Sequence, residues 1–185
     1  MSVGDAAAAL VVVFERGGVR WYVFGAQAVV LHGVARTTQD IDVTVLVPAA
    51  GATVLAQDLA AGGFVHRFPD RSAELIAIAA VIPMTHATSG VDVDIVLAGS
   101  GLEELACSAA ESRLLDGVRV PVVTVSHLAV MKVLAGRPKD LEDVRGLLAA
   151  GGVDRAEVLD LLGQLEEALG QSDLVPLFEE LGRRR

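Results

Sequence analysis

The sequence predicts an α+β fold, in which a mixed sheet flanked by helices is followed by a helical C-terminal part. Strand-like apolar runs alternate with helical segments up to about residue 125, and only helical patterns follow. The chain of 185 residues is also long enough to bury a sizeable core. We therefore expect a sheet domain over residues 1–125 and a helical region over residues 126–185 that packs on it.

The first half of the chain alternates between helical and strand-like patterns. The expected elements are a helix over residues 5–16, a strand over 19–25, a helix over 26–33, a strand over 40–47, a helix over 50–63 and a strand over 64–68. Glycines and Pro48 mark the ends of these elements, because neither residue type readily continues regular structure. The apolar run 72–80 is too short for its pattern to separate a helix from a strand.

The second half begins with two more strands and ends in helices. The expected elements are strands over 80–87 and 91–99, a helix over 101–112, a hairpin over 113–120, helices over 127–135 and 138–152, and two closing helices. The Asp116-Gly117 pair is a typical hairpin turn. Ser126, Asp154 and Ser172 are expected N-caps, because their side chains can accept hydrogen bonds from backbone N–H groups at a helix start.

The composition excludes several classes of protein. A net charge of −9 and a pI of about 4.8 argue against broad, nonspecific nucleic-acid binding, which depends on neutralising phosphates. The single cysteine, Cys107, allows no internal disulfide and no cysteine zinc cluster, which fits a reducing cytoplasm. The apolar run 6–14 follows Asp5 instead of a basic flank and is too short to span a membrane. We expect a cytoplasmic protein without a membrane segment.

Two strand-like runs carry paired acids. Asp40 and Asp42 lie one residue apart, so alternation places both carboxylates on one face of a strand. Like charges held that close cost free energy unless a cation lies between them. Asp92 and Asp94 repeat the spacing in a later strand. Carboxylates converging from two strands favour a site for Mg²⁺ or Mn²⁺. The alternative is that they are solvated charges on an outward face.

Gly25 ends a strand, and a helical pattern begins at once. Such a turn presents free backbone N–H groups and the positive end of a helix dipole to a phosphate. The alternative interpretation is a tight turn in which glycine is merely tolerated.

Residues 25–42 resemble the nucleotidyltransferase superfamily of DNA polymerase beta, in which a Gly-Gly or Gly-Ser turn precedes an Asp-x-Asp on the next strand. The stretch VARTTQDIDV is similar to the Arg-x-Thr-x-Asp-Ile-Asp-Val form of small bacterial members related to AbiEii-type toxins and MNT-type proteins. VDVDIVLAGSGLEEL is similar to their third-acid strand and following helix, and VSHLAVMKVLAGRPKDLEDVRGLL to their C-terminal signature. The resemblance spans about residues 22–148.

The resemblance implies roles for particular residues. Asp40, Asp42 and Asp94 would be the metal ligands and catalytic acids, with Asp94 rather than Asp92 as the third acid. The residues implied at the nucleotide are Gly25, Ala26, Arg36, Thr38, Lys132 and Lys139. Ala26 stands where the family has Gly or Ser, which keeps the backbone donors but removes a hydroxyl. Asp143 has a structural interpretation, because acids near a helix start suit the helix dipole.

The leading hypothesis is a metal-dependent nucleotidyltransferase that moves a nucleoside monophosphate from an NTP to an acceptor and releases pyrophosphate. The acceptor stays open between a tRNA end, a protein and a small molecule. The resemblance also implies a toxin–antitoxin relation and an antitoxin partner. The competing hypothesis is a catalytically silent nucleotide-binding or protein-interaction module of the same fold.

Overall fold

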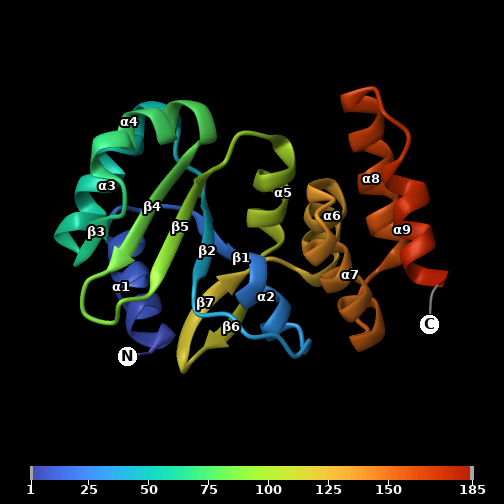
Figure 1. Ribbon diagram of the computed structural model, residues 1–185, viewed down its shortest axis with the longest axis horizontal. Coiled ribbons are helices and arrows are strands. Elements are labelled where there is room, and N and C mark those ends of the chain that lie inside the picture. The colour runs from blue at the N-terminus through green and yellow to red at the C-terminus, as the bar shows by residue number, and fades with distance from the viewer. Residues whose placement is uncertain (1, 184–185) are drawn as a thin grey trace.

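A computed structural model describes residues 2–183 as one mixed sheet with helices around it, which confirms the expected α+β class (Figure 1). The strand order is β3-β4-β5-β2-β1-β7-β6. β2 runs parallel to β5 and antiparallel to β1, and β1 runs parallel to β7. The strands are β1 (Trp21–Phe24), β2 (Ile41–Val45), β3 (Phe64–His66), β4 (Val81–His86), β5 (Asp92–Leu97), β6 (Glu111–Leu115) and β7 (Val118–Val122).

The helices gather at the two ends of the sheet and over its faces. Figure 1 shows α6–α9 together at one end of the molecule, and α1, α3 and α4 at the other. The helices are α1 (Val3–Arg16), α2 (Gly25–Leu31), α3 (Ala52–Ala61), α4 (Ser72–Glu74), α5 (Gly101–Ala109), α6 (Val125–Ala135), α7 (Pro138–Ala150), α8 (Arg155–Leu169) and α9 (Leu174–Arg183). Short turns add η1 (Ala49–Gly51), η2 (Pro69–Arg71) and the π-helical η3 (Leu75–Ala79).

Alternation along the central strands divides apolar from polar side chains. In β2, Ile41, Val43 and Val45 are fully buried in the main core, whereas Asp42 lies on the opposite face. The same alternation in β5 buries Ile95 and turns Asp94 to the face of Asp42. One face of the sheet therefore supplies the core and the other carries the acids.

Helix α6 lies between two apolar clusters. Leu128 belongs to the main core, whereas Val130 and Val133 belong to a second cluster with α7, α8 and α9. A helix that is apolar on several sides must be covered on several sides. Helix α6 contributes to both clusters, so the clusters do not divide the chain at residue 125. The expected domain boundary there stays a prediction.

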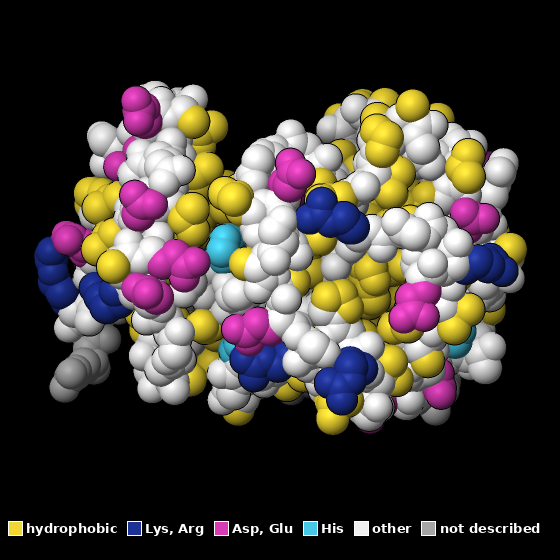
Figure 2. All heavy atoms as spheres, turned by 180° about the vertical axis from the view of Figure 1, so that it is seen from behind, with side chains coloured by type: hydrophobic (Ala, Val, Ile, Leu, Met, Phe, Trp, Pro, Cys, Tyr) yellow, Lys and Arg dark blue, Asp and Glu magenta, His cyan; other side chains and the backbone are white. Residues whose placement is uncertain are grey.

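Figure 2 views the molecule from behind and shows a notch between the C-terminal helices and the rest of the protein. Hydrophobic side chains lie on the side of these helices that faces the notch.

Some local expectations need correction. The N-cap of α6 is Thr124, whose hydroxyl accepts a hydrogen bond from the His127 N–H, and not Ser126. The Ser126 hydroxyl instead accepts from the N–H of Asp154, which is the expected cap of α8. α9 begins at Leu174, so Asp173 rather than Ser172 precedes it. The ambiguous run 72–80 is a short helix that continues as the π-helical turn.

Within residues 2–183, no helix is both long and apolar enough to cross a membrane.

Candidate functional site

A cavity of about 300 Å³ lies where β1 ends and β2 and β5 begin, and α6 and α7 close its other side. All of the site residues expected from the sequence line it: Gly25, Ala26, Arg36, Thr38, Asp40, Asp42, Asp94, Lys132 and Lys139. Arg137 and Asp140 line it as well. The fold therefore brings together residues that are more than a hundred positions apart in the sequence, although it assigns them no role by itself.

The acids on the sheet lie in register. Phe24 pairs with Asp42 across β1 and β2, and Asp42 pairs with Asp94 across β2 and β5. Register partners share a face, so both carboxylates border the cavity. Asp92 also lies on this face, one pleat away, but it borders a different cavity together with Asp40. The structure thus places Asp94, and not Asp92, in the cavity that both Asp40 and Asp42 line.

The turn at Gly25 is shaped around Asp42. Gly25 has a φ of +65°, and a Cβ there would overlap the Asp42 carboxylate. The backbone N–H of Ala26 lies close enough to the Asp42 carboxylate to lower its pKa. Burial and the nearby Asp40 charge nevertheless raise the pKa of Asp42, with the Ala26 N–H offsetting part of this shift. Asp42 is therefore a half-buried carboxylate whose charge is poorly balanced.

Asp40 lies in a different environment. The Thr38 hydroxyl donates a hydrogen bond to Asp40, and this contact lowers the pKa of the carboxyl group against a smaller opposing effect of burial. Backbone N–H groups and Arg36 act in the same direction. Neighbouring carboxyl groups with oppositely shifted pKa values are a frequent feature of functional sites.

Arg67, which no motif had indicated, contacts the third acid. It follows β3, and its guanidinium group forms an ion pair with Asp94 and a second one with Asp92 at 3.5 Å. Its backbone N–H donates to the carbonyl oxygen of Pro83, and Pro83 is the register partner of Asp94. The strand order β3-β4-β5 thus places Arg67 against the acid.

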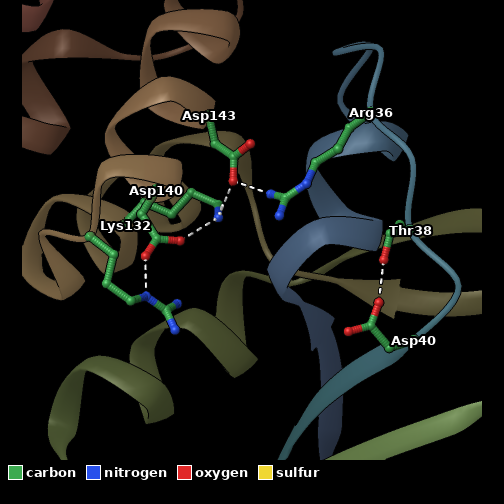
Figure 3. Close-up of polar contacts among 7 residues, drawn as sticks. Arg36, Thr38, Asp40, Lys132, Asp140 and Asp143 are labelled. Atoms are coloured by element: carbon green, nitrogen blue, oxygen red, sulfur yellow. Dashed lines mark hydrogen bonds and ion pairs between the residues drawn. The ribbon is translucent and has the colours of Figure 1, made fainter.

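The helical side of the cavity carries a compact set of ion pairs, here called the α6–α7 clasp: Arg36, Lys132, Arg137, Asp140 and Asp143 (Figure 3). Lys132 is 6% exposed, and its ammonium group lies 3.0 Å from Asp140 and 2.6 Å from Asp143. Arg36 reaches Asp143 from the loop after α2, and Arg137 pairs with Asp140.

The clasp keeps Asp140 charged. Burial opposes ionisation of Asp140, but hydrogen bonds from Arg137 and Lys132 outweigh it and lower the pKa of this carboxyl group. In Figure 3, Asp143 lies between Arg36 and Lys132, so the clasp connects the loop before β2 to α6 and α7.

The two lysines of the cavity differ sharply. Lys132 is buried and already has two carboxylate partners. Lys139 is exposed and makes no ion pair within the described residues 2–183, yet it acts electrostatically on Asp42. Lys139 is therefore the cation with charge available for an anionic ligand, whereas Lys132 belongs to the clasp.

The candidate acids are suitable ligands for a divalent ion, but their side chains are not arranged as a metal site in this structure. Carboxylate oxygens suit Mg²⁺, which commonly takes one or two protein carboxylates and completes its shell with water and phosphate oxygens. Among residues 2–183, no group of three or more His, Cys, Asp or Glu side chains is assembled as a metal site. Asp40 and Asp42 would hold such an ion, and Asp94 could join only after parting from Arg67.

Comparisons with known proteins support the fold. No protein-family model and no curated protein sequence matches the chain. Among solved structures, the lincosamide antibiotic adenylyltransferase LnuA, bound to lincomycin, matches with a TM-score of 0.50 and 13% identity over 81% of this chain and 99% of LnuA. The antibiotic-resistance factor ANT(2'')-Ia matches with a TM-score of 0.56 and 13% identity over 92% and 95% of the two chains. The chain has the nucleotidyltransferase fold.

Proposed function

We propose that this chain is a metal-dependent nucleotidyltransferase, which moves a nucleoside monophosphate from an NTP to an acceptor hydroxyl. The observation that supports this most is the pair Asp40 and Asp42, which borders a cavity of the nucleotidyltransferase fold. Lys139, which makes no ion pair within residues 2–183, lines the same cavity. Clustered carboxylates facing available positive charge suit a metal–triphosphate ligand.

In the proposed reaction the acceptor oxygen attacks the α-phosphorus. An oxygen–phosphorus bond forms, the bond to the bridging oxygen of pyrophosphate breaks, and pyrophosphate leaves with the electron pair. The acceptor proton passes to Asp94 once Arg67 has released it. A bound Mg²⁺ or Mn²⁺ would supply charge neutralisation at the phosphate oxygens. The protein contributes positioning and a preorganised electrostatic environment.

The nucleotide phosphates are assigned to the wall formed by Gly25, Ala26, Arg36, Thr38 and the lysines. Gly25 shapes this wall, because its missing side chain leaves room for the Asp42 carboxylate beside the turn. Of the two lysines, Lys139 is the expected phosphate contact and Lys132 acts by holding α6 and α7 in place. Mg²⁺ binding, the AbiEii/MNT subtype, an antitoxin partner and a cytoplasmic location belong to the same proposal.

A second candidate is a silent nucleotide-binding or protein-interaction module. The observation that favours it is the ion pair of Asp94 with Arg67, because an acid neutralised by a fixed cation is a poor metal ligand and a weak base. Ala26, which lacks a serine hydroxyl, points the same way.

Incubation with each α-labelled NTP and Mg²⁺, together with candidate tRNA, protein and small-molecule acceptors, tests the proposal. Transfer of label to one acceptor with release of pyrophosphate, absent in Asp42→Asn, is the expected result. Tight NTP binding without transfer to any of the three acceptor classes would instead favour the silent module.

A further inference from the structure

A second cavity, of about 380 Å³, adjoins the candidate site on the same face of the sheet. Phe24 lines both cavities. The floor of the second cavity is made by Tyr22, Thr44 and Val96, from β1, β2 and β5. α5, α6 and α8 close it with mostly apolar side chains, including Leu102, Met131 and Leu165. We call it the apolar chamber.

Strand register fixes the distance between the chamber and the acids. Thr44 lies two residues after Asp42 on β2, and Val96 lies two residues after Asp94 on β5. Two residues of a strand span about 7 Å, and their side chains point to the same face. A molecule of modest size can therefore place one end at the acids and its body in the chamber.

The chamber contains a buried polar atom without a partner. Tyr22 has no exposed surface, and its hydroxyl makes no hydrogen bond that meets normal geometry within residues 2–183. Thr44 is near enough to influence Tyr22, but burial is the larger effect and raises the pKa of the phenol, so the hydroxyl keeps its proton. Buried polar groups are normally hydrogen-bonded, so this exception requires an explanation. A ligand atom in the chamber would supply the partner.

The charges around the chamber narrow the class of ligand. None of the described residues that line it is Lys or Arg, which disfavours phosphate-rich ligands such as RNA. Glu103 is its one acidic lining residue, and this carboxylate already accepts hydrogen bonds from the backbone N–H and the hydroxyl of Ser100. A polycationic ligand would therefore find only this one carboxylate among the described residues that line the chamber. Apolar walls with a few hydroxyl groups suit a neutral molecule.

We infer that the apolar chamber binds the body of a small, neutral alcohol, with the Tyr22 hydroxyl hydrogen-bonded to it. This inference rests on the proposed function, because the alcohol would be the acceptor and its reacting hydroxyl would lie at the acids. It commits to a small molecule among the three acceptor classes. In the transfer step, the hydroxyl oxygen forms the new ester bond to the α-phosphorus, its proton passes to Asp94, and pyrophosphate is the leaving group.

Binding is tested without nucleotide or metal, so that the result does not depend on transferase activity. The probe is phenylbutanol, followed by the methyl resonance of Met131, which lines the chamber. Met84 is 1% exposed in the main core and lies outside the chamber, so its methyl resonance is the internal reference. The expected result is a saturable shift of Met131 with Met84 unchanged.

Two variants make the test specific. Tyr22→Phe keeps the ring and removes the unpartnered hydroxyl. With no nucleotide or metal at the acids, the single hydroxyl of phenylbutanol is free to bond Tyr22, so this probe should bind the variant about 3- to 10-fold more weakly, the value of one hydrogen bond. Hydroxyl-free butylbenzene should bind this variant and the unchanged protein equally. Val96→Trp should fill the floor of the chamber and abolish the Met131 shift, whereas Val65→Trp, at an exposed position of β3, should leave it intact.

The inference is overturned if phenylbutanol does not shift Met131. It is also overturned if ATP or adenosine competes with the alcohol, since the chamber would then hold the nucleoside. If the protein binds the alcohol but transfers no label, the proposed function is wrong and the chamber assignment still holds. If label is transferred to tRNA or protein and the alcohol does not bind, the chamber assignment is wrong and the proposed function still holds.

Discussion

The cavity has acidic groups on two sides, and the two sides are built in opposite ways. On the sheet, Asp40 and Asp42 lie near each other and form no ion pair with any residue of the described range 2–183. Burial and repulsion from Asp40 raise the pKa of Asp42. On α7, Asp140 and Asp143 are more deeply buried, yet each has two cationic partners. The acids on α7 are thus paired with cations, whereas on the sheet the charge of Asp40 is stabilised by hydrogen bonds and that of Asp42 is disfavoured.

This difference suggests different roles for the two sides: the acids on α7 stabilise the fold, and the acids on the sheet are available to a ligand. A buried acid surrounded by cations has its interactions complete in the folded protein, so it contributes structure and has little left to offer a ligand. An acid pair without a cation carries unfavourable energy that a bound ion can relieve. The side with the worse internal electrostatics is therefore the one expected to bind the metal, and the side with the better electrostatics holds α6 and α7 against the sheet.

The largest expected effect comes from opening the clasp. Lys132→Met should lower the free energy of unfolding by about 3–5 kcal/mol, because it leaves two buried carboxylates short of a partner. The matched control is Lys139→Met, an exposed lysine of the same cavity, for which a change within about 0.5 kcal/mol is expected. Urea unfolding without nucleotide measures both. Equal stabilities would mean that the clasp does not hold the fold together.

The same two lysine variants sharpen the contrast when NTP is added. Lys139→Met should weaken NTP binding while leaving stability unchanged, because its charge is free for phosphate. If titration calorimetry instead shows that only a well-folded Lys132→Met loses NTP affinity, the assignment of the two lysines must be exchanged.

The second effect concerns the sheet side. Asp42→Asn should reduce nucleotidyl transfer by about 10²- to 10³-fold, comparable to the loss of one preorganised electrostatic contact at a reacting group. Stability should not fall, because the substitution removes a charge that burial and Asp40 disfavour. Asp143→Asn, on the helical side, is the control: it removes a charge paired with two cations and should lower the free energy of unfolding. An Asp42→Asn protein with full activity would remove the metal site from this pair.

The sequence was sufficient to predict which residues of the sheet lie together at the cavity. Asp40, Asp42 and Gly25 are close in sequence, and strand alternation with the glycine turn fixes their relative positions. The mixed sheet and its hairpin followed from the same local patterns.

Long-range pairing was beyond those patterns. Arg67 reaches Asp94 only because β4 lies between β3 and β5, and strand order is not written in any local stretch. The pairing of Lys132 with two acids likewise depends on how α6 packs against α7. Ser126 was misassigned as a cap because Thr124, two residues earlier, offers the same chemistry.

The sheet side also contains one ion pair, between Arg67 and Asp94, so the difference between the two sides of the cavity is not complete. The Arg67–Asp94 pair is partly exposed, with side chains 25% and 41% accessible, so it is worth about 1 kcal/mol. Arg67→Ala should therefore tighten Mn²⁺ binding by about fivefold in the nucleotide-free protein, because Asp94 becomes available. Arg71→Ala, an exposed arginine paired with Glu74, is the control. Unchanged or weaker Mn²⁺ binding would place Asp94 outside the metal site.

The smallest expected effect is a difference in pH dependence between the two sides, measured in chelator. The pKa of Asp42 is raised on folding, mainly by burial, so its charged form opposes folding, and removing that charge stabilises the protein only above the ordinary carboxyl value of 3.8. Asp42→Asn should thus be more stable than the unchanged protein near neutral pH, with the gain vanishing as the pH falls below 3.8.

The pKa of Asp140 is lowered, because hydrogen bonds from Arg137 and Lys132 outweigh burial. Its charged form therefore favours folding above 3.8, and this stability is lost as the pH falls through the folded-state pKa. Asp140→Asn should therefore be less stable near neutral pH and should converge with the unchanged protein in acid. Thermal unfolding from acid to neutral pH measures both curves, and two curves that diverge from the unchanged protein in the same direction would show that the two sides of the cavity do not differ in the way their charges are balanced.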